Sequence, residues 1–211
     1  IDPVNYKVGN PNLKPQQTHS FELGWQYRKA PLTALATLYF RENEKVVTDV
    51  VTESSGVFVT TRSNASKTRN GGLELVLNGK LAKDLTYSIS NNTFWVELDG
   101  ASLGFPGKRS GVTAQGRGSI SWQATPKDLV QINGFVTGKR LTPQGYQRSA
   151  TGIDLGYRRK INESLSLLIA VQDFLGVYRE KQVIDTPTLK SLVVRDPDAR
   201  FVRATLAWTF G

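Results

Sequence analysis

Few side chains in this sequence have the type and spacing that catalysis or metal binding requires. The 211 residues include one histidine, His19, and no cysteine. A histidine-based triad and a His-cluster metal site are therefore unsupported, and disulfides and thiolate metal sites are excluded. The Gly-Lys-Arg-Ser run at Gly107–Ser110 lacks the glycine spacing of a phosphate-binding loop and is interpreted as an ordinary loop. We interpret His19 as a residue at a strand start, and we expect no enzyme and no cofactor.

The remaining charged residues are two carboxylate pairs and scattered cations. Glu42 with Glu44, and Asp196 with Asp198, lie in or near predicted outer loops. Each pair could bind a cation, but solvated loop charges are the simpler interpretation. Lysine and arginine exceed aspartate and glutamate by 27 to 18, a formal net charge of +9. The cations occur singly rather than in a long tract, which favours solvated turns and polar strand faces over a nucleic-acid interface.

The elements that would position these charges are strands. In the closing segment, Ala204, Leu206, Trp208 and Phe210 fall on one parity, and polar or small residues fall on the other. A period of two predicts a strand with one apolar face and one polar face. Nine segments share this pattern, with Phe135 as the least regular position: 18–28, 32–51, 57–77, 85–95, 112–122, 130–137, 151–158, 165–171 and 201–210. None shows the spacing of a helix.

The predicted connections are sorted by length. Short turns follow the first, third, fifth and seventh strands, whereas long loops near 98–109, 139–147 and 175–200 follow the fourth, sixth and eighth. Outer-membrane barrels are built this way, with short periplasmic turns and long outer loops. A soluble β-sandwich has no reason to sort its loops and uses strands of about five or six residues. The sequence contains no run of about 18 apolar residues, so it predicts no membrane-spanning helix. The pattern therefore predicts an all-β, antiparallel transmembrane β-barrel.

The odd number of strands predicts that the barrel is larger than this chain. Bacterial single-chain barrels have even strand counts, because both termini return to the periplasm. With the last strand running inward, the first of nine also runs inward and lacks a neighbour. Alone, the nine strands would leave two open edges, which lipid does not tolerate. We therefore expect residues 1–211 to be the C-terminal part of a single barrel domain.

Four motifs carry a resemblance to a known family. The run Val8–Gly24, which contains Asn-Pro-Asn-Leu-Lys-Pro-Gln followed by Phe-Glu-Leu-Gly, resembles a segment of TonB-dependent outer-membrane receptors, with Gln16 where Glu is usual. Gly71–Leu75 is similar to the recurring Gly-Leu-Glu-Leu pattern of that family. Val171–Leu175 resembles its penultimate-strand Val-x-Asp-Leu-Phe signature, and Arg203–Phe210 resembles its C-terminal strand. One departure is Gly211, which follows the terminal aromatic residue.

The resemblance implies a 22-stranded barrel in the outer membrane of a Gram-negative bacterium, plugged by an N-terminal domain that is absent from these 211 residues. It implies uptake of a scarce ligand, foremost a ferric siderophore, which binds at the outer mouth. The implied partners are outer-membrane lipid, the rest of the barrel, the plug and the TonB complex, which acts through the missing N-terminal region. A passive outer-membrane pore and a soluble β-sheet binding module are the alternatives.

Two groups of side chains are the predicted functional residues. Cations of the long loops could attract an anionic ligand such as a metal chelate; they are Lys108, Arg109, Lys139, Arg140, Arg148, Arg179 and Lys181. Aromatic residues near strand ends fit a membrane girdle; they are Trp25, Tyr27, Tyr87, Trp95, Trp122, Tyr157, Trp208 and Phe210. For Trp95, ordinary sheet packing is a competing interpretation.

Overall fold

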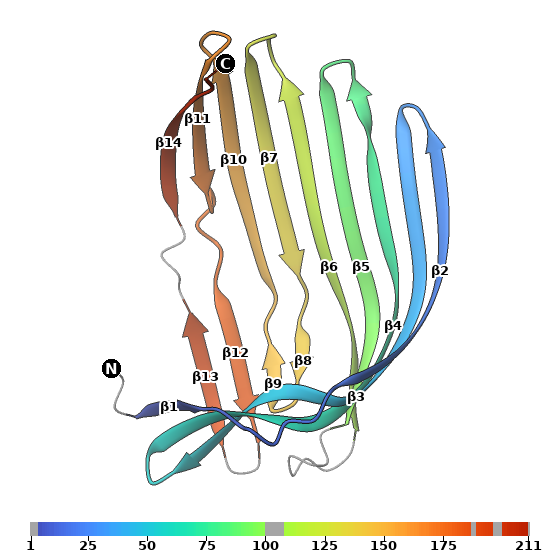
Figure 1. The fold of residues 1–211 in the computed structure, drawn as a ribbon, viewed down its shortest axis with the longest axis vertical. Helices are drawn as coiled ribbons and strands as arrows, with labels where there is room; N and C mark the ends of the chain where they lie inside the picture. The colour runs from blue at the N-terminus through green and yellow to red at the C-terminus, as the bar shows by residue number, and fades with distance from the viewer. Residues whose placement is uncertain (1–3, 100–107, 187–188, 196–199, 211) are drawn as a thin grey trace.

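The computed structural model describes residues 4–99, 108–186, 189–195 and 200–210, and nine long strands form one curved wall (Figure 1). The strands pair in the order β14-β11-β10-β7-β6-β5-β4-β3-β2, each antiparallel to its neighbours. Their bounds are β2 (Gln17–Lys29), β3 (Leu32–Ser54), β4 (Val57–Ala82), β5 (Leu85–Asp99), β6 (Lys108–Gln123), β7 (Asp128–Thr137), β10 (Ala150–Lys160), β11 (Leu165–Gln172) and β14 (Phe201–Trp208). The nine-stranded antiparallel prediction is therefore confirmed. None of the described residues forms a helix suited to crossing a bilayer.

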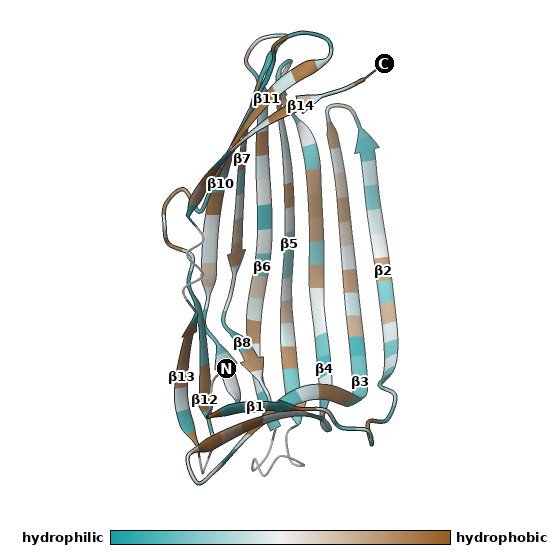
Figure 2. Cartoon of the chain, turned by 60° about the vertical axis from the view of Figure 1, so that its left-hand side comes forward, coloured by the Kyte–Doolittle hydropathy of each residue, from teal (hydrophilic) through white to brown (hydrophobic). Residues whose placement is uncertain are grey.

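The register aligns the apolar parity of every strand with that of its neighbours. Leu38, for example, faces Leu23 on one side and Leu73 on the other. Because a one-residue slip would reverse every side chain, this alignment specifies the register. One face of the wall is therefore largely apolar and exposed, and Figure 2 shows the resulting bands along the strands. Two polar exceptions on that face, Asn91 and Thr93, are hydrogen-bonded to each other at 2.9 Å.

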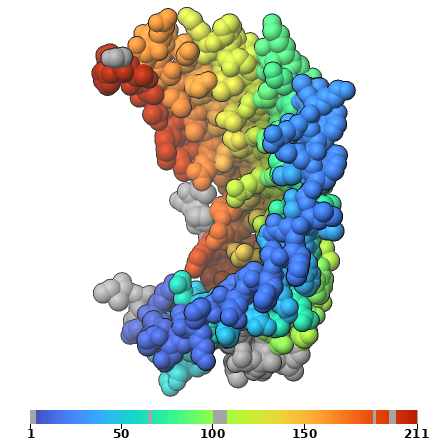
Figure 3. All heavy atoms as spheres, turned by 45° about the vertical axis from the view of Figure 1, so that its right-hand side comes forward, coloured from blue at the N-terminus to red at the C-terminus, as the bar shows by residue number. Residues whose placement is uncertain are grey.

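The opposite face is polar and lines a trough of about 770 Å³. Figure 3 shows the solid wall curving from β2 (blue) round to β14 (red). Ser88, Gln115 and Arg117 are among the residues that line the trough. Near one edge of the same face, Arg41 and Glu22 form an ion pair of 2.7 Å. The two faces thus match the lipid side and the lumen side of a barrel.

The short turns lie together at one end of the wall, at the top of Figure 1. They are residues 30–31, 83–84, 124–127 and 161–164. Local side-chain hydrogen bonds hold these turns. The side-chain oxygen of Asn162, Oδ1, accepts the backbone N–H groups of Ser164 and Leu165, at 2.9 and 2.8 Å. Such Asx-type bonds are why asparagine is favoured in tight turns.

The predicted long loops at 139–147 and 175–200 are partly strands, so that part of the prediction is wrong. They contain β8 (Arg140–Thr142), β9 (Gly145–Gln147), β12 (Glu180–Asp185) and β13 (Lys190–Arg195), which form a second sheet in the order β13-β12-β9-β8. Three-residue strands are too short for a readable alternation, and the pairing of β9 with β12 is a long-range contact. An unpredicted strand, β1 (Asn5–Val8), pairs parallel with β4.

The β3–β4 hairpin extends well beyond the length that a membrane requires. Its strands have 23 and 26 residues, whereas about 9 to 11 suffice to cross a bilayer. The ladder is irregular between Asn43 and Val46, where Lys45 has a φ of 55°. Beyond that bulge the hairpin bends across the long-connection end of the wall (Figure 1). Its tip is a two-residue turn with positive φ at both Ser55 and Gly56, as a tight hairpin turn requires.

Strands β2 and β14 are the two edges of the wall. Within the described part of the chain they pair with β3 and β11 respectively and not with each other. The barrel is therefore open, and the backbone groups along each edge are available for a further strand.

Candidate functional site

The mouth of the wall is built by the distal β3–β4 hairpin, β1 and the second sheet. One side chain joins the first and last of these parts. The Gln144 amide, in the turn between β8 and β9, donates to the Val51 carbonyl at 2.9 Å and accepts the Val51 N–H at 2.8 Å. The Gln144 carbonyl in turn accepts the backbone N–H of Asp185 at 2.7 Å. The hairpin is thus docked onto the second sheet.

Three of the predicted cations form a row across the second sheet. Arg140 pairs with Gln147, and Gln147 pairs with Gln182. One step further along these registers lie Lys139, Arg148 and Lys181, and the Arg148 N–H donates to the Lys181 carbonyl at 2.8 Å. The backbones of paired strands are about 4.8 Å apart, so residues one step beyond these ladders are neighbours. We call Lys139, Arg148 and Lys181 the basic row.

The basic row lies on the same face as Tyr146. The Lys139 ammonium sits over the Tyr146 ring, 4.0 Å from its centroid. Arg148 and Tyr146 both line a hollow of about 420 Å³ on this sheet. Like charges on neighbouring strands repel each other. Within the described residues, no carboxylate lies within ion-pair distance of any member of the row. An anion bound across the row would relieve this repulsion.

The other four predicted cations lie apart from the basic row. Lys108 forms an ion pair of 3.3 Å with Glu97, and Arg109 is opposite Leu98 in β6. Arg140 lies one step from the row, on the opposite face, and donates to the Gln147 side chain at 2.7 Å. Arg179 donates to the Tyr178 carbonyl at 2.7 Å. The assignment to loops is wrong for four of the seven, because the following are strand residues: Lys108, Arg109, Arg140 and Lys181.

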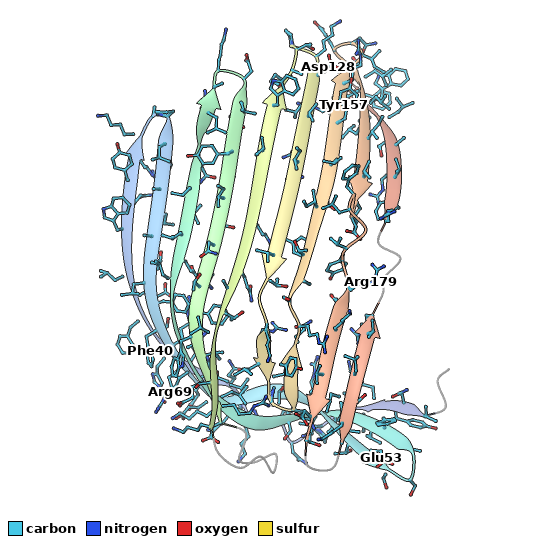
Figure 4. All side chains as sticks on the ribbon, turned by 180° about the vertical axis from the view of Figure 1, so that it is seen from behind. Phe40, Glu53, Arg69, Asp128, Tyr157 and Arg179 are labelled. Atoms are coloured by element: carbon cyan, nitrogen blue, oxygen red, sulfur yellow. The ribbon has the colours of Figure 1, made fainter. Side chains whose placement is uncertain are left out.

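The carboxylate pair Glu42 and Glu44 belongs to β3 and is paired with cations of β4. Lys67 contacts Glu42 at 2.7 Å and Glu44 at 2.8 Å, and Arg69 contacts Glu42 at 3.0 Å. These side chains follow Phe40 on its face of the sheet, beyond the apolar band; Figure 4 labels Phe40 and Arg69. Among the described residues no group of three metal-ligating side chains is found. His19 is exposed in β2, opposite Glu42. Asp196 and Asp198 lie outside the described residues.

A contact that the sequence did not predict explains the irregular Phe135. This ring lies on the polar face and packs edge-on against Tyr178, with centroids 5.6 Å apart. The Tyr178 hydroxyl donates to Glu180 at 2.5 Å, and this bond together with burial raises the pKa of Tyr178. The buried Asp173 carboxylate accepts the backbone N–H groups of Val177 and Tyr178. Asp173, from the penultimate-strand motif, therefore shapes the turn that brings Tyr178 back to the wall.

The predicted girdle residues occupy two levels of the apolar face. Seven lie near the short-turn end: Trp25, Tyr27, Tyr87, Trp122, Tyr157, Trp208 and Phe210. There the Tyr157 hydroxyl donates to Asp128 at 2.6 Å, and Figure 4 labels both residues. Trp95 lies at the opposite level, where Phe21 and Phe40 are cross-strand partners. From Tyr87 to Trp95 the strand rises about 26 Å, close to the height of about 25 Å of a barrel's apolar band. The girdle role remains a prediction.

Solved structures of two receptors and a transporter share the fold. The siderophore receptor PirA from Pseudomonas aeruginosa matches with a TM-score of 0.64 and 18% identity, over 97% of this chain and 32% of that one. The copper transporter OprC matches at 0.68 and 15%, over 95% and 33%. The ferric yersiniabactin uptake receptor FyuA from Yersinia pestis matches at 0.69 and 16%, over 93% and 30%. The chain thus spans about a third of each.

The family comparison covers almost the whole chain. The outer membrane protein beta-barrel family matches residues 1–208. No match was found among curated proteins. Together with the open nine-stranded wall and its apolar face, this match confirms the barrel fold, its likeness to TonB-dependent receptors and its location in the outer membrane. The chain belongs to the outer membrane protein beta-barrel family.

Proposed function

We propose that this chain is part of the barrel of a TonB-dependent receptor that takes up a scarce anionic ligand, foremost a ferric siderophore or another metal chelate. Three structures of similar fold are named as a siderophore receptor, a copper transporter and a ferric yersiniabactin uptake receptor. Their likeness supports transport as the general activity. The anionic character of the ligand rests on residues of this chain.

The observation that carries the proposal is the basic row. Lys181 is a residue of β12, whereas Lys139 directly precedes β8 and Arg148 directly follows β9. Groups anchored beside paired strands are held more precisely than groups on long loops. Asp185, a carboxylate that lines the same hollow as Arg148, is opposite Lys190 in the register and, within the described residues, forms no ion pair with the row. A chelate with several ionised oxygens would accept charge-assisted hydrogen bonds from all three cations.

The open edges indicate how the rest of the receptor would be arranged. We propose that further strands pair with β2 and β14 and complete a 22-stranded barrel. A plug domain, supplied by a region outside residues 1–211, would then occupy the polar trough beside Ser88, Gln115 and Arg117. In this arrangement the TonB complex would act on the plug from the short-turn side, and the basic row would face the medium.

Metal uptake by cells with and without the gene tests this proposal. Spent medium from an iron-limited culture would be split on an anion exchanger, and metals taken up from each fraction would be measured by elemental mass spectrometry. The retained, anionic fraction should lose most of its uptake when the gene is deleted or when a protonophore removes the membrane potential. Uptake that survives the protonophore but not the deletion would favour a passive pore. Equal uptake with and without the gene contradicts both functions.

A further inference from the structure

The short-turn end of the wall carries many cations and few carboxylates. Exposed lysines and arginines cluster in the turns and last strand positions there: Arg28, Lys29, Lys80, Lys83, Lys127, Arg158, Arg159 and Lys160. The carboxylates at this end are Asp84, Asp128 and Glu163. Asp128 is already paired with Arg159 at 3.3 Å. Within the described residues, Lys83, Lys127 and Lys160 have no ion-pair partner.

The turns that carry these lysines are neighbours along the rim. The Gln123 N–H donates to the Asp84 carbonyl at 2.8 Å, which joins the β6–β7 turn to the β4–β5 turn. The Lys160 N–H donates to the Lys127 carbonyl at 2.8 Å, which joins the β6–β7 turn to the β10–β11 turn. Lys83, Lys127 and Lys160 therefore belong to three consecutive turns.

An apolar groove of about 440 Å³ ends at this rim. Leu85, Ile120, Trp122, Val130 and Ile132 line its length, and Lys83 and Asp84 stand at its end. All five apolar residues have the parity of the lipid-facing side, since Trp122 is opposite both Leu85 and Val130, and Ile120 is opposite Ile132. The groove therefore opens toward the hydrocarbon of the bilayer. Lys83, at its end, lies at the depth of the lipid headgroups.

We propose that this groove binds an anionic phospholipid, with an acyl chain along Trp122 and Ile132 and the headgroup phosphate at Lys83 and Lys127. The charge at the rim complements a phosphodiester that bears a net negative charge. A lysine beside an anionic membrane surface contributes about 1 kcal/mol, which is about fivefold in a binding constant. The shape of the groove accounts for the chain, and the lysines account for the choice of headgroup.

Quenching of Trp122 fluorescence by brominated lipids tests this site in the intact protein. The protein and its Trp122→Phe variant would be reconstituted in mixtures with brominated phosphatidylglycerol or brominated phosphatidylcholine, and the difference isolates the Trp122 signal. Phosphatidylglycerol should compete for the groove about fivefold or more better than phosphatidylcholine. The double variant Lys83→Gln/Lys127→Gln should bring the two lipids close to equality. Lys45→Gln, a matched change at the opposite end, should leave the preference unchanged.

Salt gives a second test that needs no lysine variant. Ionic strength weakens attraction between exposed charges, so the preference of the unmodified protein should fall as salt is raised. Ile132→Phe, which fills the groove, should reduce quenching by both lipids. Equal quenching by the two lipids at low salt would overturn the proposal, and so would a preference that persists in the folded double variant.

Discussion

The Gln144 side chain bonds both the N–H and the carbonyl of Val51, from a position 93 residues away in the sequence. A side-chain amide here takes the place of a neighbouring strand, because it offers one acceptor and one donor to the same residue. The contact holds the distal β3–β4 hairpin against the sheet that carries the basic row. Gln144 is therefore the contact that docks the hairpin onto this sheet, while β1 pairs with its other strand, β4.

Replacement of Gln144 by alanine should release the distal hairpin. Two hydrogen bonds are lost, each with a net value of about 1 kcal/mol, so local opening should become at least tenfold more frequent. Hydrogen exchange of residues 46–60 measures this opening. Gln182→Ala, a matched change at an exposed position of β12, is the control and should leave the exchange unchanged. Unchanged protection in Gln144→Ala would show that other contacts hold the hairpin.

Asp173 should act through backbone geometry rather than through ligand binding. Its carboxylate accepts two N–H groups of the following turn, and its φ is 46°. Asparagine keeps an acceptor and tolerates this conformation, whereas alanine keeps neither property. We therefore expect Asp173→Ala to lower the free energy of unfolding by about 1–3 kcal/mol and Asp173→Asn to have a smaller effect. Urea unfolding in lipid vesicles measures both, and equal effects would contradict this role.

Gly72 is expected to tolerate no side chain. A Cβ at this position would lie 2.6 Å from the Thr93 carbonyl oxygen and 2.9 Å from the Phe94 Cα. Since both contacts are with backbone, Gly72→Ala should push β5 away and cost about 1–3 kcal/mol. Gly24→Ala, where a Cβ meets nothing within 4 Å, is the control. The folded fraction of each variant can be measured by heat-modifiable migration on SDS gels. Equal folded fractions in Gly72→Ala and Gly24→Ala would argue against the close approach of β4 and β5.

The assignment of the two faces leads to a paired test at Ile89 and Ser88. Ile89 lies on the apolar face and Ser88 in the polar trough. An arginine facing lipid costs up to about 2–4 kcal/mol, less toward the interfaces, whereas lumen substitutions are tolerated. Ile89→Arg should therefore destabilise the folded barrel in vesicles, and Ser88→Arg should not. A larger loss at Ser88 would reverse the assignment of the faces.

Alternation was sufficient to predict the wall, and its limits are physical. Leu73, Leu75 and Leu77 report their face directly, because side chains on a strand have a period of two. The second sheet left no such signal, since Gly145 to Gln147 is only three residues long. Its pairing depends on β12, which is distant in the sequence.

The sequence was sufficient to predict which residue types form the candidate site, but not which of these residues lie together. Net charge and loop position selected seven cations, but only a register between distant strands brings Lys139, Arg148 and Lys181 together. The same register turns Arg140 to the opposite face. Phe135 was marked by its exception to the alternation, although its partner Tyr178 comes from a turn shaped by Asp173. Exceptions to a pattern can therefore indicate tertiary contacts without identifying the partner.

Binding of an anionic chelate to the basic row is the most direct test of the proposed function. The intact protein and two variants, Lys139→Gln/Arg148→Gln/Lys181→Gln and the control Arg140→Gln, would be titrated with the anion-exchange-retained metal fraction. Bound metal would be measured at low and high salt. Loss of charged hydrogen bonds of at least about 1.5 kcal/mol each predicts more than a hundredfold weaker binding in the triple variant, a reduced salt dependence and little change in Arg140→Gln. Equal affinity and equal salt dependence in all three proteins would contradict the account.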